Sequence, residues 1–287
     1  MKVLLTGATG FLGKRVTGRL EQAGHRVLPV SRAPGRGFDW SEESLRKGVG
    51  ACDAVCHLAG ESIAARWTGR RKGEVLRSRV ETTDRLARLL AEKGSGALVS
   101  ASAVGFYGDR GDEELDETSG AGTGFLAEVC RAWEDATRPA RDAGLRVAAV
   151  RIGVILGAEG GALKRMLPVF RLGLGGRLGS GDQWFPWVHA DDLACLFVHL
   201  LESRSATGVY NGTSPNPVKN REFTATLARV LGRPAFLPAP AFALRLVLGE
   251  MAEMLLGGQR ALPRRAPEAR FTFNHPDLEP ALHDLLS

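Results

Sequence analysis

The stretch TGATGFLG at residues 6–13 decides the fold. It follows a short apolar run at residues 2–5 and leads into a segment, residues 12–20, in which apolar residues recur at helical spacing. Gly24 ends this predicted helix, and a second apolar run covers residues 25–30. A strand, a glycine turn, a helix and a second strand within about thirty residues predict one βαβ unit.

Apolar, strand-like runs alternate with helix-like segments beyond this unit. Predicted strands cover residues 53–58, 97–100 and 145–152, whereas predicted helices cover residues 67–93 and 125–143. This alternation predicts an α/β chain with a Rossmann-type, doubly wound parallel sheet, in which ligands bind at the carboxyl ends of the strands.

The composition changes after Gly153, where glycines and prolines become frequent. We predict that residues 1–153 form a nucleotide-binding core and that residues 154–287 mainly form a smaller, substrate-binding lobe. Residues 188–212 contain a helix-like run followed by a strand-like run. We therefore expect them to return to the core.

The overall composition excludes several classes of protein. Hydrophobic residues make up 44% of the 287 residues and charged residues 24%, which is typical of a globular chain and not of a disordered one. The net charge of +6 is spread without a run of like charges, so we expect no nucleic-acid partner. The four cysteines form no CxxC pair, so we expect neither a metal site nor disulfides. Neither a signal peptide nor an apolar stretch of about 18 residues occurs, so we expect a cytoplasmic protein without a membrane partner.

The glycine turn has the spacing of a dinucleotide-binding site. Gly7 permits the turn, Gly10 lets the backbone approach a pyrophosphate, and Gly13 allows the helix to pack closely. The second strand ends at Ser31-Arg32 instead of at the acidic residue that would bind the ribose 2′-hydroxyl of NAD. Arg32 can pair with a 2′-phosphate, so we predict NADP as the cofactor. The alternative is that Arg32 is an ordinary surface arginine.

Several longer segments resemble those of a known family: TGATGFLG (6–13), HLAGESI (57–63), SRVETT (78–83), RIGVILG (151–157) and GLGGRLGSGDQWFPWVHADDLA (173–194). Over nearly its whole length the chain resembles the atypical, extended branch of the short-chain dehydrogenase/reductase superfamily. Within that branch it is similar to the epimerase-family proteins of nucleoside-diphosphate-sugar epimerase type, which are sometimes labelled cell-division-inhibitor-like. The resemblance implies a Rossmann core, a nicotinamide cofactor, a small-molecule substrate and, as for many members, a homodimer.

The motif and the resemblance together indicate which residues contact the cofactor: Thr6, Gly7, Thr9, Gly10, Phe11, Leu12, Gly13, Ser31, Arg32, Leu58, Ala59, Gly60 and Arg151. Most of them follow the first three predicted strands. Arg151 lies near the end of a later one, and together with Arg177 it has the charge to contact a phosphate or a carboxylate.

The resemblance also implies a catalytic group of serine or threonine, tyrosine and lysine, with the last two in a YxxxK motif on a helix. Ser102 matches the serine position, although a hydroxyl at a strand end can equally satisfy backbone groups. Residues 124–134, GFLAEVCRAWE, contain neither tyrosine nor lysine, and Phe125 or Leu126 falls at the tyrosine position. We therefore expect Tyr107 to replace the missing acid or base, with a packing role as the alternative.

Four residues of the lobe are expected to wall a substrate pocket over the nicotinamide: Gln183, Trp184, Trp187 and His189. The alternative is a packing seam between lobe and core. His189 can form a proton relay with Asp191 and Asp192, although one of these acids can instead cap the following helix. Lys164 can reach an anionic ligand or remain an exposed helix residue.

These observations predict an NADP-dependent, epimerase- or oxidoreductase-like protein with a degenerate Tyr–Lys pair. Its substrate is expected to be small and anionic, such as a nucleotide sugar. The alternative is a non-catalytic NADP(H)-binding sensor or interaction protein on a Rossmann fold.

Overall fold

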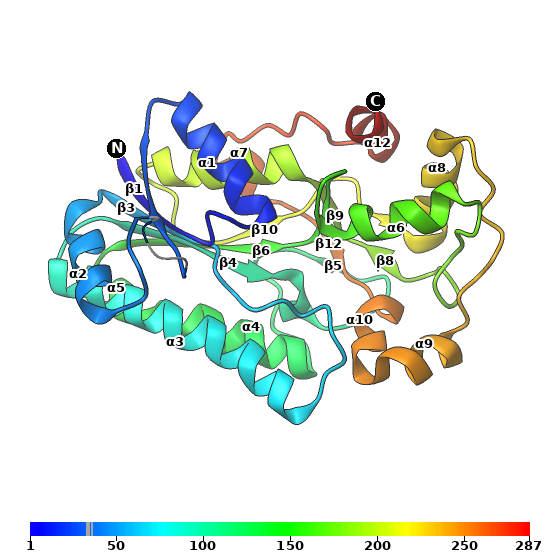
Figure 1. Ribbon diagram of the computed structural model, residues 1–287, viewed down its shortest axis with the longest axis horizontal. Helices are drawn as coiled ribbons and strands as arrows, with labels where there is room; N and C mark the ends of the chain where they lie inside the picture. The colour runs from blue at the N-terminus through cyan, green and yellow to red at the C-terminus, as the bar shows by residue number, and fades with distance from the viewer. Residues whose placement is uncertain (33–34, 36) are drawn as a thin grey trace.

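The computed structural model describes residues 1–32, 35 and 37–287 and is built around one parallel sheet (Figure 1). Six strands lie in the order β10-β6-β4-β3-β1-β2, and each neighbouring pair is parallel. Their bounds are β1 (Lys2–Thr6), β2 (Arg26–Val30), β3 (Ala54–His57), β4 (Ala97–Ala103), β6 (Arg146–Ile152) and β10 (Gly208–Gly212). The predicted α/β, Rossmann-type sheet is confirmed.

Helices cover both faces of this sheet (Figure 1). On one face α1 (Phe11–Gln22) packs against α7 (Ala190–Glu202). The other face carries α2 (Glu42–Ala51), α3 (Gly69–Lys93), α4 (Phe125–Asp135) and α5 (Arg138–Asp142). The chain builds outward from β1 to β2 and then returns to the other side of β1 as β3, so the strand order reverses between β1 and β3. This reversal is where doubly wound sheets bind ligands, at the carboxyl ends of the strands.

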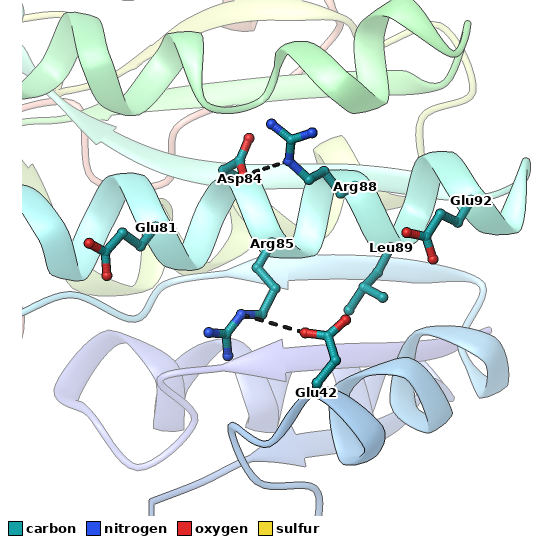
Figure 2. A pocket seen from close by; sticks show the side chains of 7 residues that line it. All are labelled: Glu42, Glu81, Asp84, Arg85, Arg88, Leu89 and Glu92. Atoms are coloured by element: carbon teal, nitrogen blue, oxygen red, sulfur yellow. Dashed lines mark hydrogen bonds and ion pairs between the residues drawn. The ribbon is translucent and has the colours of Figure 1, made fainter.

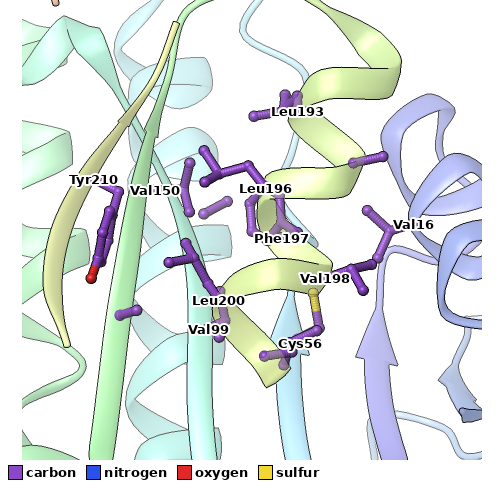
Figure 3. Packing of buried hydrophobic residues seen from close by; sticks show 14 of the residues in the cluster. Val16, Cys56, Val99, Val150, Leu193, Leu196, Phe197, Val198, Leu200 and Tyr210 are labelled. Carbon is purple, nitrogen blue, oxygen red and sulfur yellow. The ribbon is translucent and has the colours of Figure 1, made fainter. Parts of the chain in front are cut away.

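The larger core cluster holds α7 on the sheet (Figure 3). Leu196, Phe197 and Leu200 of α7 are fully buried, and they cluster with Val99 of β4 and Val150 of β6. Burying side chains of this size contributes about 1.5–3 kcal/mol each. This anchor lies just before the segment that enters the sheet as β10.

The helix expected over residues 125–143 is in fact two helices. α4 ends at Asp135, and α5 begins at Arg138 with Pro139 in its first turn. Proline has no N–H, so the hydrogen-bond ladder of α4 cannot continue through it. The break directs the chain into β6.

Most of the remaining elements form a smaller lobe at the end of the molecule opposite α2 (Figure 1). The remaining elements are η1 (Val104–Tyr107), β5 (Glu114–Leu115), β7 (Val154–Leu156), α6 (Gly161–Arg171), β8 (Trp184–Phe185), β9 (Trp187–His189), β11 (Val218–Lys219), α8 (Asn220–Leu231), α9 (Ala241–Leu248), η2 (Gly249–Ala252), α10 (Glu253–Leu256), β12 (Arg260–Ala261), α11 (Arg265–Glu268) and α12 (Leu278–Leu286). Its centre is a cluster that includes Leu167 of α6, Phe223 of α8 and Leu282 of α12. Across the described residues, no helix has both the length and the apolar character needed to cross a membrane.

Candidate cofactor and substrate site

The turn between β1 and α1 is closed by contacts that only glycine permits. Gly7 has a φ of +74°, and a Cβ there would lie 3.0 Å from the backbone nitrogen of Ala59. A Cβ on Gly13 would lie 2.0 Å from the carbonyl oxygen of Gly7, to which the Gly10 amide donates at 2.9 Å. In the described part of the chain no side chain caps α1 at Gly10, and Thr9 beside it is exposed. The amino end of α1 is therefore open to an anion.

A chain of hydrogen bonds ties β1 to β3 beside this turn. The Thr6 hydroxyl oxygen accepts the amides of Leu58 and Ala59 at 3.2 Å each. Its own proton therefore goes to Nδ1 of His57, 2.6 Å away, which leaves the imidazole proton on Nε2, 3.2 Å from the Thr82 hydroxyl. Thr6 is fully buried and its hydroxyl positions Leu58 and Ala59, while its contact with the cofactor stays a prediction.

His57, which the sequence analysis did not single out, makes stability depend on pH. Burial, together with the Arg79 guanidinium, lowers the pKa of His57 to about 3. The unfolded chain therefore binds a proton between about pH 6.5 and pH 3 that the folded protein does not bind, so stability falls as the pH falls through this window. At pH 5 this residue lowers the free energy of unfolding by about 2 kcal/mol relative to neutral pH. This value holds for any pKa of the folded state that lies well below 5.

We expect the variant His57→Gln to lose less stability than the parent protein when the pH falls from 7.5 to 5. Glutamine keeps a hydrogen-bonding group beside Thr6 but cannot titrate. The measurement is urea unfolding at each pH, comparing slopes and not absolute stabilities. Equal slopes in the two proteins would contradict the buried, neutral histidine.

Phe11, the first residue of α1, lies against the glycine-rich segment 157–161. A Cβ on either of the glycines at 157 and 160 would come within 2.2–2.3 Å of the Phe11 ring. One turn later in α1, Arg15 pairs with Asp191 and, at 2.8 Å, with Glu159. These contacts bring the amino end of α6 beside the amino end of α1.

The other predicted cofactor residues lie around the same strand ends. Leu12 and Leu58 are partly buried and pack against the larger core cluster. Ser31 is buried at the end of β2. Gly60 is exposed, and a Cβ there would lie 3.2 Å from the guanidinium carbon of Arg79.

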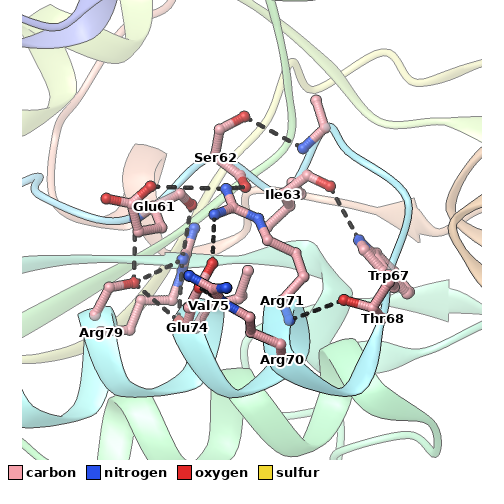
Figure 4. Close-up of polar contacts among 12 residues, drawn as sticks. Glu61, Ser62, Ile63, Trp67, Thr68, Arg70, Arg71, Glu74, Val75 and Arg79 are labelled. Atoms are coloured by element: carbon pink, nitrogen blue, oxygen red, sulfur yellow. Dashed lines mark hydrogen bonds and ion pairs between the residues drawn. The ribbon is translucent and has the colours of Figure 1, made fainter.

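Arg32 lies at the carboxyl end of β2, where the 2′-phosphate was expected. Its side chain is 84% exposed, and Nη1 donates to Oε1 of Glu61 at 3.1 Å. Arg71 lies 3.6 Å from the other carboxylate oxygen of Glu61, and Arg79 donates to the Glu61 carbonyl at 3.0 Å (Figure 4). Arg71 also pairs with Glu74 at 3.1 Å. The guanidinium groups around these two carboxylates outnumber them, since Arg70 also pairs with Glu74 at 2.9 Å, and the excess positive charge suits a phosphate.

Ser102, Tyr107 and Arg151 are brought together, but in a closed internal network. Arg151 forms a two-point ion pair with Glu134 of α4, through Nε at 2.8 Å and Nη2 at 2.9 Å. Ser102 donates to the same carboxylate at 2.7 Å, and Nη1 of Arg151 donates to the Tyr107 hydroxyl at 3.0 Å. That hydroxyl donates in turn to Asn211 at 2.7 Å. All three predicted residues are at most 4% exposed.

This network gives all three predicted residues partners inside the protein, so their roles toward cofactor and substrate stay predictions. The Arg151 guanidinium lies 3.3 Å from the centre of the Phe106 ring and is paired with Glu134, so its charge is already compensated inside the protein. The Ser102 hydroxyl is buried and already bonded. Burial raises the pKa of Tyr107 to about 12, so this hydroxyl keeps its proton. Sequence reasoning missed Glu134, because nothing near it in the chain shows that its partner lies on β6.

Phe125 begins α4, at the position where the family resemblance places the catalytic tyrosine. Trp67 contacts it edge to face, with 5.1 Å between ring centres. The Lys72 ammonium of α3 lies 5.2 Å from the Phe125 ring centre and pairs with Glu250 of the lobe. Leu126, the other residue considered for this position, packs beside Gly105. A charged ammonium group therefore lies over the ring that replaces the tyrosine.

The four residues expected to wall the substrate pocket separate into two pairs. Trp187 and His189 are at most 1% exposed, and the Trp187 indole N–H donates to a backbone carbonyl at 3.0 Å. Both side chains belong to the interior, so their contact with substrate stays a prediction without support from their exposure. Trp184 and Gln183 are partly exposed. Trp184 donates to Asp112 at 2.7 Å, and the Gln183 amide donates to two backbone carbonyls.

His189 caps α7 and does not start a proton relay. Its Nδ1 accepts the Asp191 amide at 3.2 Å, so the neutral ring carries its proton on Nε2. Asp192 is fully buried and accepts the His275 amide at 2.8 Å. Nε2 of His189 lies 3.3 Å from Asp284, and His275 stacks on the ring. These three side chains approach one another as metal ligands do, but a metal on Nε2 would require a proton on Nδ1, where the Asp191 amide points.

A groove between α2 and α3 is lined mainly by charged side chains (Figure 2): Glu42, Glu81, Asp84, Arg85, Arg88, Leu89 and Glu92. Arg88 pairs with Asp84 at 2.7 Å, and Arg85 lies 3.8 Å from Glu42. The lining has four carboxylates against two guanidinium groups, which does not suit an anionic cofactor, and the glycine turn takes no part in the groove. The candidate site therefore lies at the carboxyl ends of β1, β2 and β3.

Comparison with known proteins gives the site a context. Residues 3–211 match the NAD dependent epimerase/dehydratase family, and residues 239–285 match a domain of unknown function, DUF1731. The epimerase family protein SDR39U1 homolog, chloroplastic, of Arabidopsis thaliana is 42% identical over 302 residues, covering 100% of this chain and 87% of the relative. The crystal structure of human epimerase family protein SDR39U1 (isoform 2) with NADPH is similar with a TM-score of 0.92 and 40% identity over 99% of each chain. A nucleoside-diphosphate sugar epimerase from Corynebacterium glutamicum is similar with a TM-score of 0.82 and 36% identity, covering 100% of this chain and 58% of that one.

Proposed function

The chain belongs to the NAD-dependent epimerase/dehydratase family, and from this premise we propose that it binds NADP(H) where β1 and β3 diverge and acts on a small, anionic substrate. A nucleotide sugar is the substrate class we would test first. The observation that carries the choice of cofactor is Arg32 at the end of β2, where an NAD-binding chain would have an acidic residue. A relative that is 40% identical was crystallised with NADPH, which supports the same choice.

The residues at the strand ends fit such a cofactor. The glycine turn leaves no room for a Cβ at Gly13, and it presents the uncapped amino end of α1 to a pyrophosphate. Arg32 would pair with the 2′-phosphate, while Leu58, Ala59 and Gly60 line the same strand ends. When bound, the nicotinamide supplies a site that gives or accepts a hydride.

We expect Arg32→Asp to weaken NADPH binding by about tenfold to a hundredfold, because a charged hydrogen bond is lost and a like charge faces the phosphate. NADH binding should be unchanged. Glu61→Gln should act in the opposite direction and tighten NADPH binding, since it frees Arg32 from its carboxylate partner. The measurement is titration of cofactor-stripped protein by nucleotide fluorescence, with Arg204→Asp, an exposed arginine after α7, as the control. Equal losses for NADPH and NADH in Arg32→Asp would disprove the phosphate contact.

The second candidate function is an NADP(H)-binding sensor without catalysis. Three observations favour it: the phenylalanine at position 125, the buried Ser102 and the raised pKa of Tyr107. If the protein is instead an enzyme, Lys72 is a candidate for proton transfer, because its ammonium group lies over the Phe125 ring. A screen of NADPH oxidation with carbonyl compounds and nucleotide sugars distinguishes the two functions. Turnover with any of them establishes the enzyme, whereas tight binding without turnover favours the sensor.

A further inference from the structure

One end of the lobe exposes a group of large apolar side chains: Val169, Leu172, Leu174, Phe236, Leu237, Phe242, Leu246 and Val247. We call these eight residues the apolar patch. Leu172, Phe242 and Leu246 are 74%, 74% and 77% exposed, which is far more than scattered surface leucines usually show. α9 has no buried residue, although five of its eight residues are leucine, valine or phenylalanine.

The two segments that carry the apolar patch lie side by side. The Leu237 amide donates to the Gly175 carbonyl at 3.2 Å, and the Ala239 amide donates to the Arg177 carbonyl at 2.9 Å. α6 and α9, which flank these contacts, both lie at the end of the molecule opposite α2 (Figure 1). The exposed side chains therefore belong to one region of the surface.

The two segments that carry the apolar patch contain positive side chains and no negative ones. Residues 161–179 and 231–249 contain no aspartate or glutamate, but they contain six exposed cations: Lys164, Arg165, Arg171, Arg177, Arg233 and Arg245. The nearest acids in the sequence already have partners: Glu250 pairs with Lys72 and Asp182 with Arg221. Glu253 pairs with Arg245, so it compensates the charge of one of the six cations. We call these six residues the cationic border.

We propose that the apolar patch and its cationic border dock onto the surface of an anionic lipid bilayer. Phenylalanine and leucine side chains of this exposure would enter the boundary between headgroups and acyl chains, and the arginines would meet lipid phosphates. A second copy of the chain is a poorer fit, because it would bring two cationic borders together. A dissolved polyanion is also a poorer fit, because it would contact the arginines and leave the apolar patch in water.

Docking on a surface needs no membrane-spanning helix. The expectation that the protein has no membrane partner rested on the absence of a spanning segment, and it does not bear on this contact. The apolar patch contains none of the residues of the glycine turn and none of those that pair around Arg32 and Glu61. Failure of the cofactor proposal would therefore leave the docking proposal standing, and the reverse also holds.

The test is co-sedimentation of the whole protein with vesicles of phosphatidylcholine alone or with phosphatidylglycerol added. We expect at least tenfold stronger partitioning into the anionic vesicles, which weakens as salt is added. Two double variants, Phe242→Ser with Leu246→Ser and Arg171→Glu with Arg233→Glu, should each lower this partitioning at least tenfold. Inorganic phosphate should not displace the protein, because a single anion cannot replace a bilayer surface.

Matched controls separate docking from general effects. Leu76→Ser removes an exposed apolar side chain outside the apolar patch, and Arg131→Glu reverses an exposed charge outside the cationic border; both should bind vesicles as the parent does. NADPH affinity and circular dichroism show whether each variant is folded. No binding to either vesicle overturns the proposal. Loss of vesicle binding in the arginine double variant alone would also overturn it, because that result points to a dissolved polyanion. A dimer of the parent protein that only the serine double variant dissociates would overturn it as well.

Discussion

Arg151→Met is expected to lower the free energy of unfolding by about 3–5 kcal/mol. Glu134, whose side chain is only 15% exposed, would lose both hydrogen bonds of its two-point ion pair and would remain as an uncompensated charge. The Tyr107 hydroxyl would lose the guanidinium that donates to it at 3.0 Å. Methionine fills a similar volume, so the effect would report charge and hydrogen bonding more than a cavity. The measurement is equilibrium unfolding in guanidinium chloride.

Two variants show whether the buried pair is responsible. Arg151→Met combined with Glu134→Gln should be more stable than Arg151→Met alone, because the isolated charge is gone. Arg138→Met is the control, because Arg138 forms an exposed ion pair with Asp135 at 3.5 Å. This variant should lower the free energy of unfolding by less than about 1 kcal/mol. A loss of similar size for Arg151→Met and Arg138→Met would show that the network contributes little.

Gly13→Ala is expected to weaken NADPH binding more than tenfold and to destabilise the protein by about 1–3 kcal/mol. The new Cβ would lie 2.0 Å from the Gly7 carbonyl oxygen and 2.8 Å from its carbonyl carbon. Both atoms are backbone, so no side chain can turn away, and the turn itself must open. An opened turn moves the amino end of α1 from the place where a pyrophosphate would bind. Nucleotide fluorescence and guanidinium unfolding measure the two effects.

Gly18→Ala is the matched control, since it makes the same change in the same helix. A Cβ at Gly18 meets no atom within 4 Å. It should therefore raise stability by roughly 0.5–1 kcal/mol through helix propensity and leave NADPH affinity unchanged. If Gly13→Ala bound NADPH as tightly as Gly18→Ala does, the site would have to lie elsewhere.

The fold could be predicted from the sequence because its signals are local. The glycine turn between a strand and a helix occupies only a few residues. Each apolar run that predicts a strand or a helix is also contained in a short stretch of the sequence. The single helix predicted over residues 125–143 was wrong for a local reason as well, since Pro139 divides it. α2 was missed because its few apolar residues stand among charged and glycine positions. α6 was missed although most of its residues are apolar, since it begins at a glycine and has Pro168 inside it.

The site could be predicted only in part, because its polar residues have distant partners. Ser102, Tyr107 and Arg151 share the carboxyl ends of β4 and β6, as a parallel sheet requires. Whether they face a ligand or one another depends on Glu134, which lies one layer away in α4. A polar residue at a strand end looks the same in both cases, so only the packing of α4 decides between them.

The position of β10 has a consequence for the order in which the protein can fold. β6 is paired with β4 on one side, but its other edge is covered only by Gly208–Gly212, which follows the α6 segment and α7 in the chain. During synthesis, the first 153 residues would therefore carry an open strand edge whose N–H and C=O groups can pair with another chain. The sheet gains its last strand only after residue 212 has left the ribosome. Much of the lobe must therefore be synthesised before the core is complete.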